Sequence, residues 1–201
     1  MNRRHFTITA AAGLLSSSFP AAAQFAGRPA RDGRDSMIAA IEAVRNADSA
    51  NAAFTAWQAT VQKVLPHLQM TALVSKVSPE GKPQSIGDVR RVFSSVPSTY
   101  PVGGWKHLSG SDWSRHVLER QQVLVASGGD ALAKYFPDHE LLRSLGTRTL
   151  VNVPVVVCRK TVGAFAFLCA QEAVEPEVTV ELERMASVAA SVFLMPGASE
   201  T

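Results

Sequence analysis

The chain has two cysteines, Cys158 and Cys169, and these are the residues from which covalent or redox chemistry would start. The apolar runs Leu150–Cys158 and Val162–Ala170 are joined by a short polar segment, a pattern that predicts a β-hairpin. Both runs are apolar on both faces, which predicts that they lie at the centre of a covered sheet.

The register of that hairpin decides whether the two thiols can meet. A two-residue turn at Lys160-Thr161 would place Cys158 opposite Gly163 and Cys169 opposite Asn152. The cysteines would then lie roughly 20 Å apart at the usual strand rise. A disulfide needs Cα atoms within about 7 Å of each other. We therefore predict two buried structural thiols and no catalytic residue.

The histidines show no metal-binding or catalytic spacing. His67, His107, His116 and His139 are scattered, no pair has His-x-x-x-His spacing, and no cysteine lies near enough to complete a zinc set. The sequence also lacks a Ser-His-Asp arrangement, a P-loop and a Rossmann glycine set. We predict no metal site, and the sequence indicates no particular cofactor.

Aromatic residues surround a glycine-rich segment between residues 100 and 113. Tyr100, Trp105 and Trp113 flank Gly103-Gly104 and Gly110, where the backbone can approach a ligand closely. Aromatic side chains with a few polar groups are typical of a small-molecule pocket. The alternative is that Trp113 is simply a core residue.

Polar candidates adjoin this segment. Arg90 and Arg91 lie on opposite faces of a predicted strand, so one of them is expected on the pocket side. That arginine would bind an anion; the alternative is that it is solvated. His116 shares a helical face with Trp113 and is a candidate for the pocket lining. The predicted ligand-binding set is Arg90, Tyr100, Trp105, Trp113, His116, Phe136 and His139.

Charge and hydropathy exclude two classes of partner. The formal net charge is +3, and it falls to +1 without residues 1–23, which carry two arginines and no acidic residue. No stripe of Lys and Arg with interleaved aromatics is present, so we expect no nucleic-acid partner. No apolar run is long enough to span a membrane, so we expect no stable transmembrane segment after processing.

The N-terminus predicts an export signal. Arg3, Arg4 and Phe6 resemble the twin-arginine signal, which exports folded proteins, and they precede the weakly apolar stretch Ile8–Phe19. This predicts a periplasmic or secreted bacterial protein. The alternative is an N-terminal helix packed on the domain.

Small residues before Gln24 suit signal peptidase, which would cut between Ala23 and Gln24. No lipobox cysteine is present, which favours release over tethering. The predicted organisation is a signal over residues 1–23, a flexible linker over 24–35, one domain over 36–195 and a tail over 196–201.

Periodicity predicts an α+β domain. Ser95–Gly110 is expected to be a loop, and Ser111 and Asp138 are expected to cap helices. Adjacent hairpins indicate an antiparallel sheet with terminal helices on one face and short helices and loops on the other. The expected helices cover 37–46, 50–65, a segment around 113–118, 130–136, 139–145 and 178–195, and the expected strands cover 70–77, 89–94, 123–126, 150–158 and 162–170.

This order, together with six short motifs, resembles the GAF family, whose fold is related to that of PAS domains. The first motifs are similar to uncharacterised bacterial GAF-containing proteins, and the resemblance extends over Ala52–Phe193. The motifs are Tyr100–Gly104, Trp113–Glu119, Phe136–Leu141, Ser144–Gly146, Asn152–Val155 and Val162-Gly163.

Three family signatures are absent. The Asn-Lys-x-Phe-Asp-Glu signature of cyclic-nucleotide GAF domains does not occur. Trp113–Leu145 contains no cysteine for a bilin, and Val125–Leu145 contains none of the cysteines of free methionine-(R)-sulfoxide reductases.

The resemblance implies a non-enzymatic, sensor-type domain that binds a small organic ligand between the sheet and Tyr100–Leu145, with no output domain of its own. It also implies a homodimer through the terminal helices, Met37–Asn46 and Val178–Phe193. Two alternatives remain: a divergent sulfoxide reductase, which would need a low-pKa thiol, and a ligand-free interaction or dimerisation domain.

Overall fold

A computed structural model describes residues 33–76 and 87–195, which belong to one compact unit. The predicted signal, its cleavage site, most of the predicted linker and the C-terminal tail lie outside the described residues.

Helices and strands alternate along the chain much as the periodicity predicts. The helices are α1 (Gly33–Arg45), α2 (Ala50–Val64), the π-helix η1 (Ser114–Glu119), α3 (Gly128–Tyr135), α4 (His139–Ser144), α5 (Pro176–Val188) and α6 (Ala190–Phe193). The strands are β1 (Gln69–Ser75), β2 (Asp88–Ser94), β3 (Gly103–His107), β4 (Leu124–Ser127), β5 (Thr149–Val157) and β6 (Lys160–Cys169).

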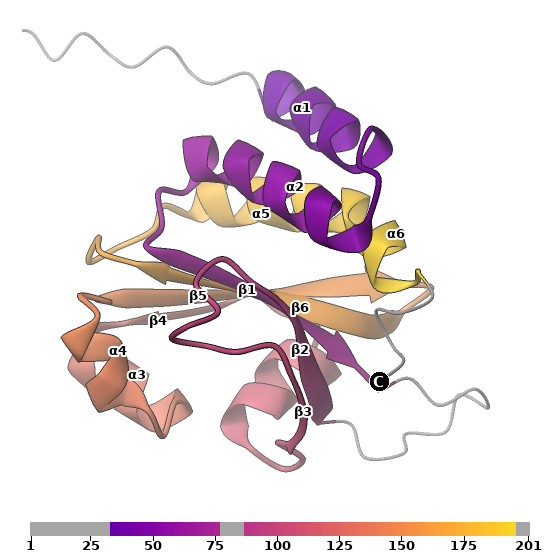
Figure 1. The fold of residues 1–201 in the computed structure, drawn as a ribbon. Coiled ribbons are helices and arrows are strands. Elements are labelled where there is room, and N and C mark those ends of the chain that lie inside the picture. Colours follow the sequence, from indigo (N-terminus) through magenta and orange to yellow (C-terminus); the bar gives the residue numbers. More distant parts are fainter. Residues whose placement is uncertain (1–32, 77–86, 196–201) are drawn as a thin grey trace, which may run out of the picture. The chain divides into compact units, whose positions relative to one another are not determined.

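The described strands form one six-stranded antiparallel sheet in the order β3-β2-β1-β6-β5-β4. The apolar hairpin β5–β6 lies inside the sheet, between β1 and the edge strand β4, and its residues are mostly buried, as its apolar faces predict. Helices α1, α2, α5 and α6 lie on one side of the sheet, and α3 and α4 lie on the other (Figure 1). The predicted α+β class and its layers are confirmed.

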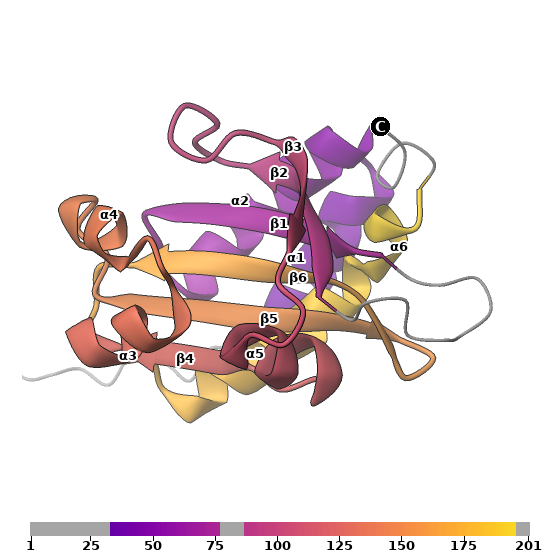
Figure 2. The same cartoon turned by 90° about the horizontal axis from the view of Figure 1, so that it is seen from below.

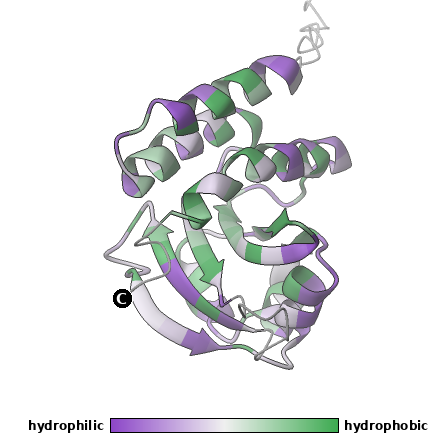
Figure 3. Ribbon diagram, turned by 90° about the vertical axis from the view of Figure 1, so that its right-hand side faces the viewer, coloured by the Kyte–Doolittle hydropathy of each residue, from purple (hydrophilic) through white to green (hydrophobic). Residues whose placement is uncertain are grey.

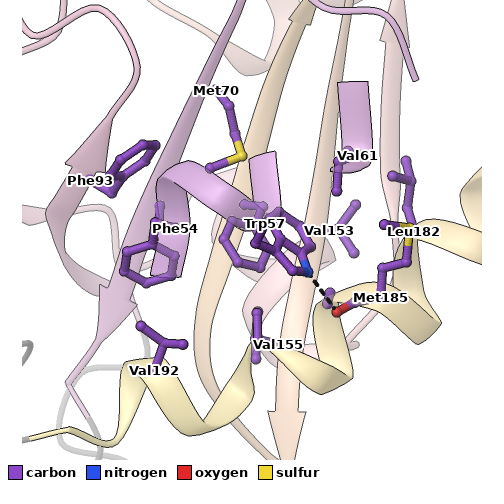
Figure 4. Packing of buried hydrophobic residues seen from close by; sticks show 14 of the residues in the cluster. Phe54, Trp57, Val61, Met70, Phe93, Val153, Val155, Leu182, Met185 and Val192 are labelled. Carbon is purple, nitrogen blue, oxygen red and sulfur yellow. Dashed lines mark hydrogen bonds between the residues drawn. The ribbon is translucent and has the colours of Figure 1, made fainter. Parts of the chain in front are cut away.

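The main core lies between the sheet and α2, α5 and α6. Ser49 caps the N-terminus of α2, because its side chain accepts a hydrogen bond from the backbone N–H of Ala52 at 3.2 Å. Trp57 of α2 stacks on Phe165 with 4.1 Å between ring centroids, and its indole N–H donates to the carbonyl of Met185 at 3.1 Å (Figure 4). Hydrophobic and hydrophilic residues alternate along the helices (Figure 3).

Four local expectations are corrected. Helix α1 begins at Gly33, inside the predicted linker. Strand β3 forms within the expected loop 95–110, where exposed residues pair with β2 and carry no apolar periodicity. The last helix breaks at Ala189 into α5 and α6. The side chain of Asp138 makes no cap hydrogen bond to α4.

The hairpin turn also differs from the prediction. It lies at Cys158-Arg159, where both residues have positive φ (49° and 63°), and Val157 pairs with Lys160. Two successive positive φ values are typical of a type I′ turn, whose twist matches that of the flanking strands. Cys158 is therefore exposed at the turn and not buried in a strand, while Cys169 is buried opposite Thr149.

Candidate functional site

A cavity of about 350 Å³ lies on the sheet face opposite α2 and α5. Figure 2 shows this face, with α3 beside β4. Its floor consists of two residues from each of four strands. The two residues are two positions apart, and such side chains point to the same face of a strand. These floor residues are Thr71 and Leu73, Val89 and Arg91, Leu150 and Asn152, and Ala166 and Leu168.

The walls come from the segments that cross this face. Tyr100, Lys106, Leu108, Trp113, Phe136 and Asp138 are among the residues that complete the lining. The Ser111 hydroxyl oxygen accepts from the backbone N–H of Ser114 at 3.0 Å, which fixes the start of the helical segment that carries Trp113. The cavity is therefore apolar over most of its floor and carries polar groups along its walls.

A buried hydrogen bond connects the wall to the floor. Trp113 is 4% exposed, and its indole N–H donates to Asn152 Oδ1 at 3.1 Å. Asn152 is 1% exposed, and its amide nitrogen is buried with no hydrogen-bond acceptor among the described residues. The Asn152 amide therefore has hydrogen-bonding capacity left that a ligand acceptor would satisfy.

Arg91, Tyr100 and Asp138 form a polar cluster at the cavity wall. The Tyr100 hydroxyl donates to Asp138 Oδ2 at 3.0 Å, and the guanidinium carbon of Arg91 lies 4.9 Å from the Tyr100 ring centroid. Burial, and then the Asp138 carboxylate, raise the pKa of Tyr100, so it remains a neutral donor. Burial lowers the pKa of Arg91, although Tyr100 and Asp138 oppose this shift.

Lys106 adds a second cation from the edge strand. It faces the cavity because β3 pairs with β2 so that Lys106 lies opposite Val89. Partial burial lowers the pKa of Lys106, the neighbouring Arg91 lowers it further, and Asp138 raises it. One wall of the cavity thus holds two cations that repel each other.

The structure brings three of the predicted ligand-binding residues together. Tyr100, Trp113 and Phe136 all line the cavity. Trp113 also packs with Val117 and Leu124 in a small core cluster, so the pocket and core interpretations of this residue both describe it.

The other four predicted site residues are not among those that line this cavity. Arg90 and Trp105 are register partners on the opposite sheet face, with the Arg90 guanidinium carbon 5.6 Å from the Trp105 ring centroid. His116 contacts the carbonyl of Val123 at 3.1 Å, and His139 contacts that of Phe136 at 3.2 Å. Each imidazole thus contacts a backbone carbonyl only a few residues away in the sequence.

Sequence reasoning missed Lys106, Asn152 and Asp138 as cavity residues. Asn152 sits in an otherwise apolar strand, and a lone amide among β-branched residues is the signal that could have identified it. Lys106 carries no such signal, because the strand that orients it was expected to be a loop.

Neither cysteine lines the cavity. Burial raises the pKa of the Cys169 thiol to about 12, which leaves it protonated at neutral pH. In residues 33–76 and 87–195, no three His, Cys, Asp or Glu side chains are grouped closely enough to hold a metal ion. Within the same ranges, no helix has the length and apolarity of a membrane span.

No protein-family profile matches the chain, and no curated protein matches it. The GAF domain of an Acinetobacter phosphoenolpyruvate-protein phosphotransferase has a similar structure, with a TM-score of 0.63 and 13% identity over 84% of this chain and 96% of that one.

Two further solved structures are similar. The GAF domain of a phosphoenolpyruvate-protein phosphotransferase from Coxiella burnetii has a TM-score of 0.61 and 12% identity, over 81% of this chain and 92% of that one. A free methionine-R-sulfoxide reductase from Neisseria meningitidis, solved with its substrate, has a TM-score of 0.53 and 12% identity, over 81% and 88%. The chain therefore has the GAF fold, which confirms the predicted architecture.

Proposed function

We propose that this GAF-fold protein is an exported, sensor-type domain that binds a small organic ligand in the cavity beneath the sheet and catalyses no reaction there. The observation that carries the proposal is the cavity itself. Its volume of about 350 Å³ lies in the range of small-molecule sites, roughly 300–1,000 Å³. An apolar floor with few polar wall groups is the composition such sites have.

Native mass spectrometry tests the proposal. The protein is purified from its host compartment and weighed under native conditions and again after denaturation. We expect a small mass that disappears on denaturation, and we expect Ala166→Leu to lose it, because Ala166 lies on the floor and a larger side chain fills the cavity. Ala43→Leu on α1, on the other side of the sheet, is the matched control. Retention of the same mass by Ala166→Leu would place the ligand elsewhere.

The sulfoxide reductase alternative needs a reactive thiol beside the substrate. Cys158 is exposed at a hairpin turn, and Cys169 is buried with a raised pKa. Neither cysteine lines the cavity, so neither provides a nucleophile there, which supports a binding role. We expect no reduction of free methionine-R-sulfoxide by the wild-type protein with a thiol reductant; turnover that disappears in a Cys158→Ser, Cys169→Ser double variant would establish the enzyme instead.

Export by the twin-arginine route is part of the proposal and rests on Arg3, Arg4 and Phe6. Replacing both arginines with lysine keeps the charge and removes the guanidinium pair. We expect the double variant to stay in the cytoplasmic fraction, whereas Arg28→Lys, outside the signal, leaves export unchanged. Equal periplasmic amounts of all three proteins would contradict this route.

A further inference from the structure

Two cations face the cavity from adjacent strands. Arg91 projects from β2 and Lys106 from β3, and both positions belong to the set of residues that line the cavity. They are close enough that Arg91 lowers the pKa of Lys106. Because Arg91 is half-buried, its charge is only partly screened by solvent.

The carboxylates of the cavity already have partners. Asp138 accepts from the Tyr100 hydroxyl, and Asp112 pairs with Arg115. Among the described residues, neither Arg91 nor Lys106 has a carboxylate oxygen within 4.0 Å. The guanidinium of Arg91 donates to a neutral carbonyl, that of Pro101, at 3.0 Å. Asp138 lies near enough to raise the pKa of both cations, but a ligand anion would supply the direct partner that they lack within this part of the chain.

Unused donors point the same way. Arg91 Nε is buried and has no acceptor among the described residues. The Asn152 amide nitrogen, at the floor of the same cavity, is in the same condition. Buried donors of this kind are normally satisfied, and a ligand rich in acceptor oxygens would satisfy both.

Apart from Thr71, the remainder of the floor is apolar. Leu73, Leu150, Ala166 and Leu168 come from three strands and place hydrocarbon side chains on the floor that also carries Arg91. A bare inorganic anion would leave this surface uncovered, whereas an organic acid would cover it and gain from burying apolar area.

We propose that the ligand is a small organic acid, with its anionic group bound by Arg91 and Lys106 and its apolar body placed on the Leu73, Leu150, Ala166 and Leu168 floor. This inference rests on the proposed function, because it names the chemical class that the same cavity takes.

A matched pair of fluorescent probes tests the class of ligand. The probes are 8-anilino-1-naphthalenesulfonate and N-phenyl-1-naphthylamine, which share one aromatic body and differ only in the sulfonate. Both are titrated into the full chain, with unfolding curves recorded to verify folding. We expect the anion to bind at least about tenfold more tightly than the neutral probe, the effect of one charge-assisted hydrogen bond.

Variants assign that preference to the two cations. Lys106→Gln and Arg91→Gln should each reduce the preference for the anionic probe several-fold and leave the neutral probe unchanged. Lys160→Gln, the same change at an exposed position of the distant hairpin, should leave both probes unchanged. Ala166→Leu should weaken both probes, because it fills the floor they share.

The outcomes separate the two proposals. Equal binding of both probes, or a preference for the anion that survives Lys106→Gln and Arg91→Gln, would overturn the organic-acid inference. If Ala166→Leu still weakened both probes, the binding function would stand. Absence of binding by both probes, or binding unaffected by Ala166→Leu, would overturn the cavity as the site and the organic-acid inference with it.

Discussion

At the scale of single residues, the Trp113–Asn152 hydrogen bond shows how one side chain serves core and cavity together. The indole fills a small apolar cluster while its N–H satisfies a buried amide oxygen in β5. A tryptophan in such a position contributes apolar area and one specific polar contact.

Trp113→Phe should therefore destabilise the protein more than the lost area implies. It leaves Asn152 Oδ1 buried without its donor, which costs about 1–3 kcal/mol in the free energy of unfolding. Urea unfolding measures the change. Trp105→Phe is the matched control and should change stability by less than about 0.5 kcal/mol, because Trp105 is 38% exposed on the edge strand. Equal effects of the two substitutions would contradict this assignment.

A buried histidine makes stability depend on pH. His67 is 8% exposed, its Nδ1 lies 2.7 Å from the carbonyl oxygen of Leu65, and its Nε2 lies 3.3 Å from Gln58 Nε2. Since a carbonyl only accepts, Nδ1 carries the proton and Nε2 accepts from Gln58. Burial lowers the pKa of His67 below 6.5, against a smaller opposing effect of the Leu65 carbonyl.

The sign of the pH dependence follows from that shift. The unfolded chain protonates His67 as pH falls through 6.5, while the folded protein resists protonation. This contribution to stability is complete above pH 6.5 and declines as pH falls toward the lower folded pKa. We expect His67→Gln to have a smaller difference in unfolding free energy between pH 7.5 and pH 5.5 than the wild-type protein. An unchanged difference in the variant would refute the role of His67.

At the scale of elements, the central hairpin depends on glycine where strands and helix meet. A Cβ at Gly163 would lie 2.5 Å from the backbone oxygen of Leu73 and 2.5 Å from Phe193 Cε1. One contact is backbone of the neighbouring strand and the other is a buried ring of α6, so neither yields easily.

Gly163→Ala should destabilise the protein by about 1–3 kcal/mol, the usual result of overpacking a core. Urea or thermal unfolding measures the change. Gly129→Ala, in the first turn of α3, is the control: its Cβ meets no heavy atom within 4 Å and its φ is not positive, so stability should be unchanged or rise slightly. A neutral Gly163→Ala would show that α6 can move away from the sheet.

At the scale of the whole molecule, the terminal helices present apolar surface away from the sheet. Ile38 and Ile41 of α1 are 49% and 44% exposed, and Val180 of α5 is also exposed. Helix α1 lies on the far side of α2 from the sheet (Figure 1). Exposed apolar residues on one helix are a basis for association between copies.

We predict that the protein forms a homodimer through α1 and α5, which light scattering after size exclusion would detect. An Ile38→Glu, Ile41→Glu double variant should elute with half the mass and keep its fold. Leu141→Glu, an exposed leucine of α4 on the opposite side of the sheet, should leave the mass unchanged. A monomeric wild-type protein would contradict the predicted homodimer.

Much of the architecture is determined by the sequence alone, because periodicity and apolar content are local properties. The apolar runs around β5 and β6 predict a central hairpin, and the spacing of Phe54, Trp57 and Val61 predicts the buried face of α2. The order of elements predicts the α+β class, and that order together with the six motifs predicts the GAF fold.

Only the tertiary structure decides which residues line the cavity. Alternation predicts that Arg90 and Arg91 lie on opposite faces of β2, but only the pairing of Arg91 with Leu73, beside an irregularity in the β1–β2 register, shows which one faces the cavity. The pairing of β3 with β2 places Trp105 on the far face and Lys106 on the near one. The physical reason is that a shift of one residue in strand register moves every side chain to the other face, and non-local hydrogen bonds set that register.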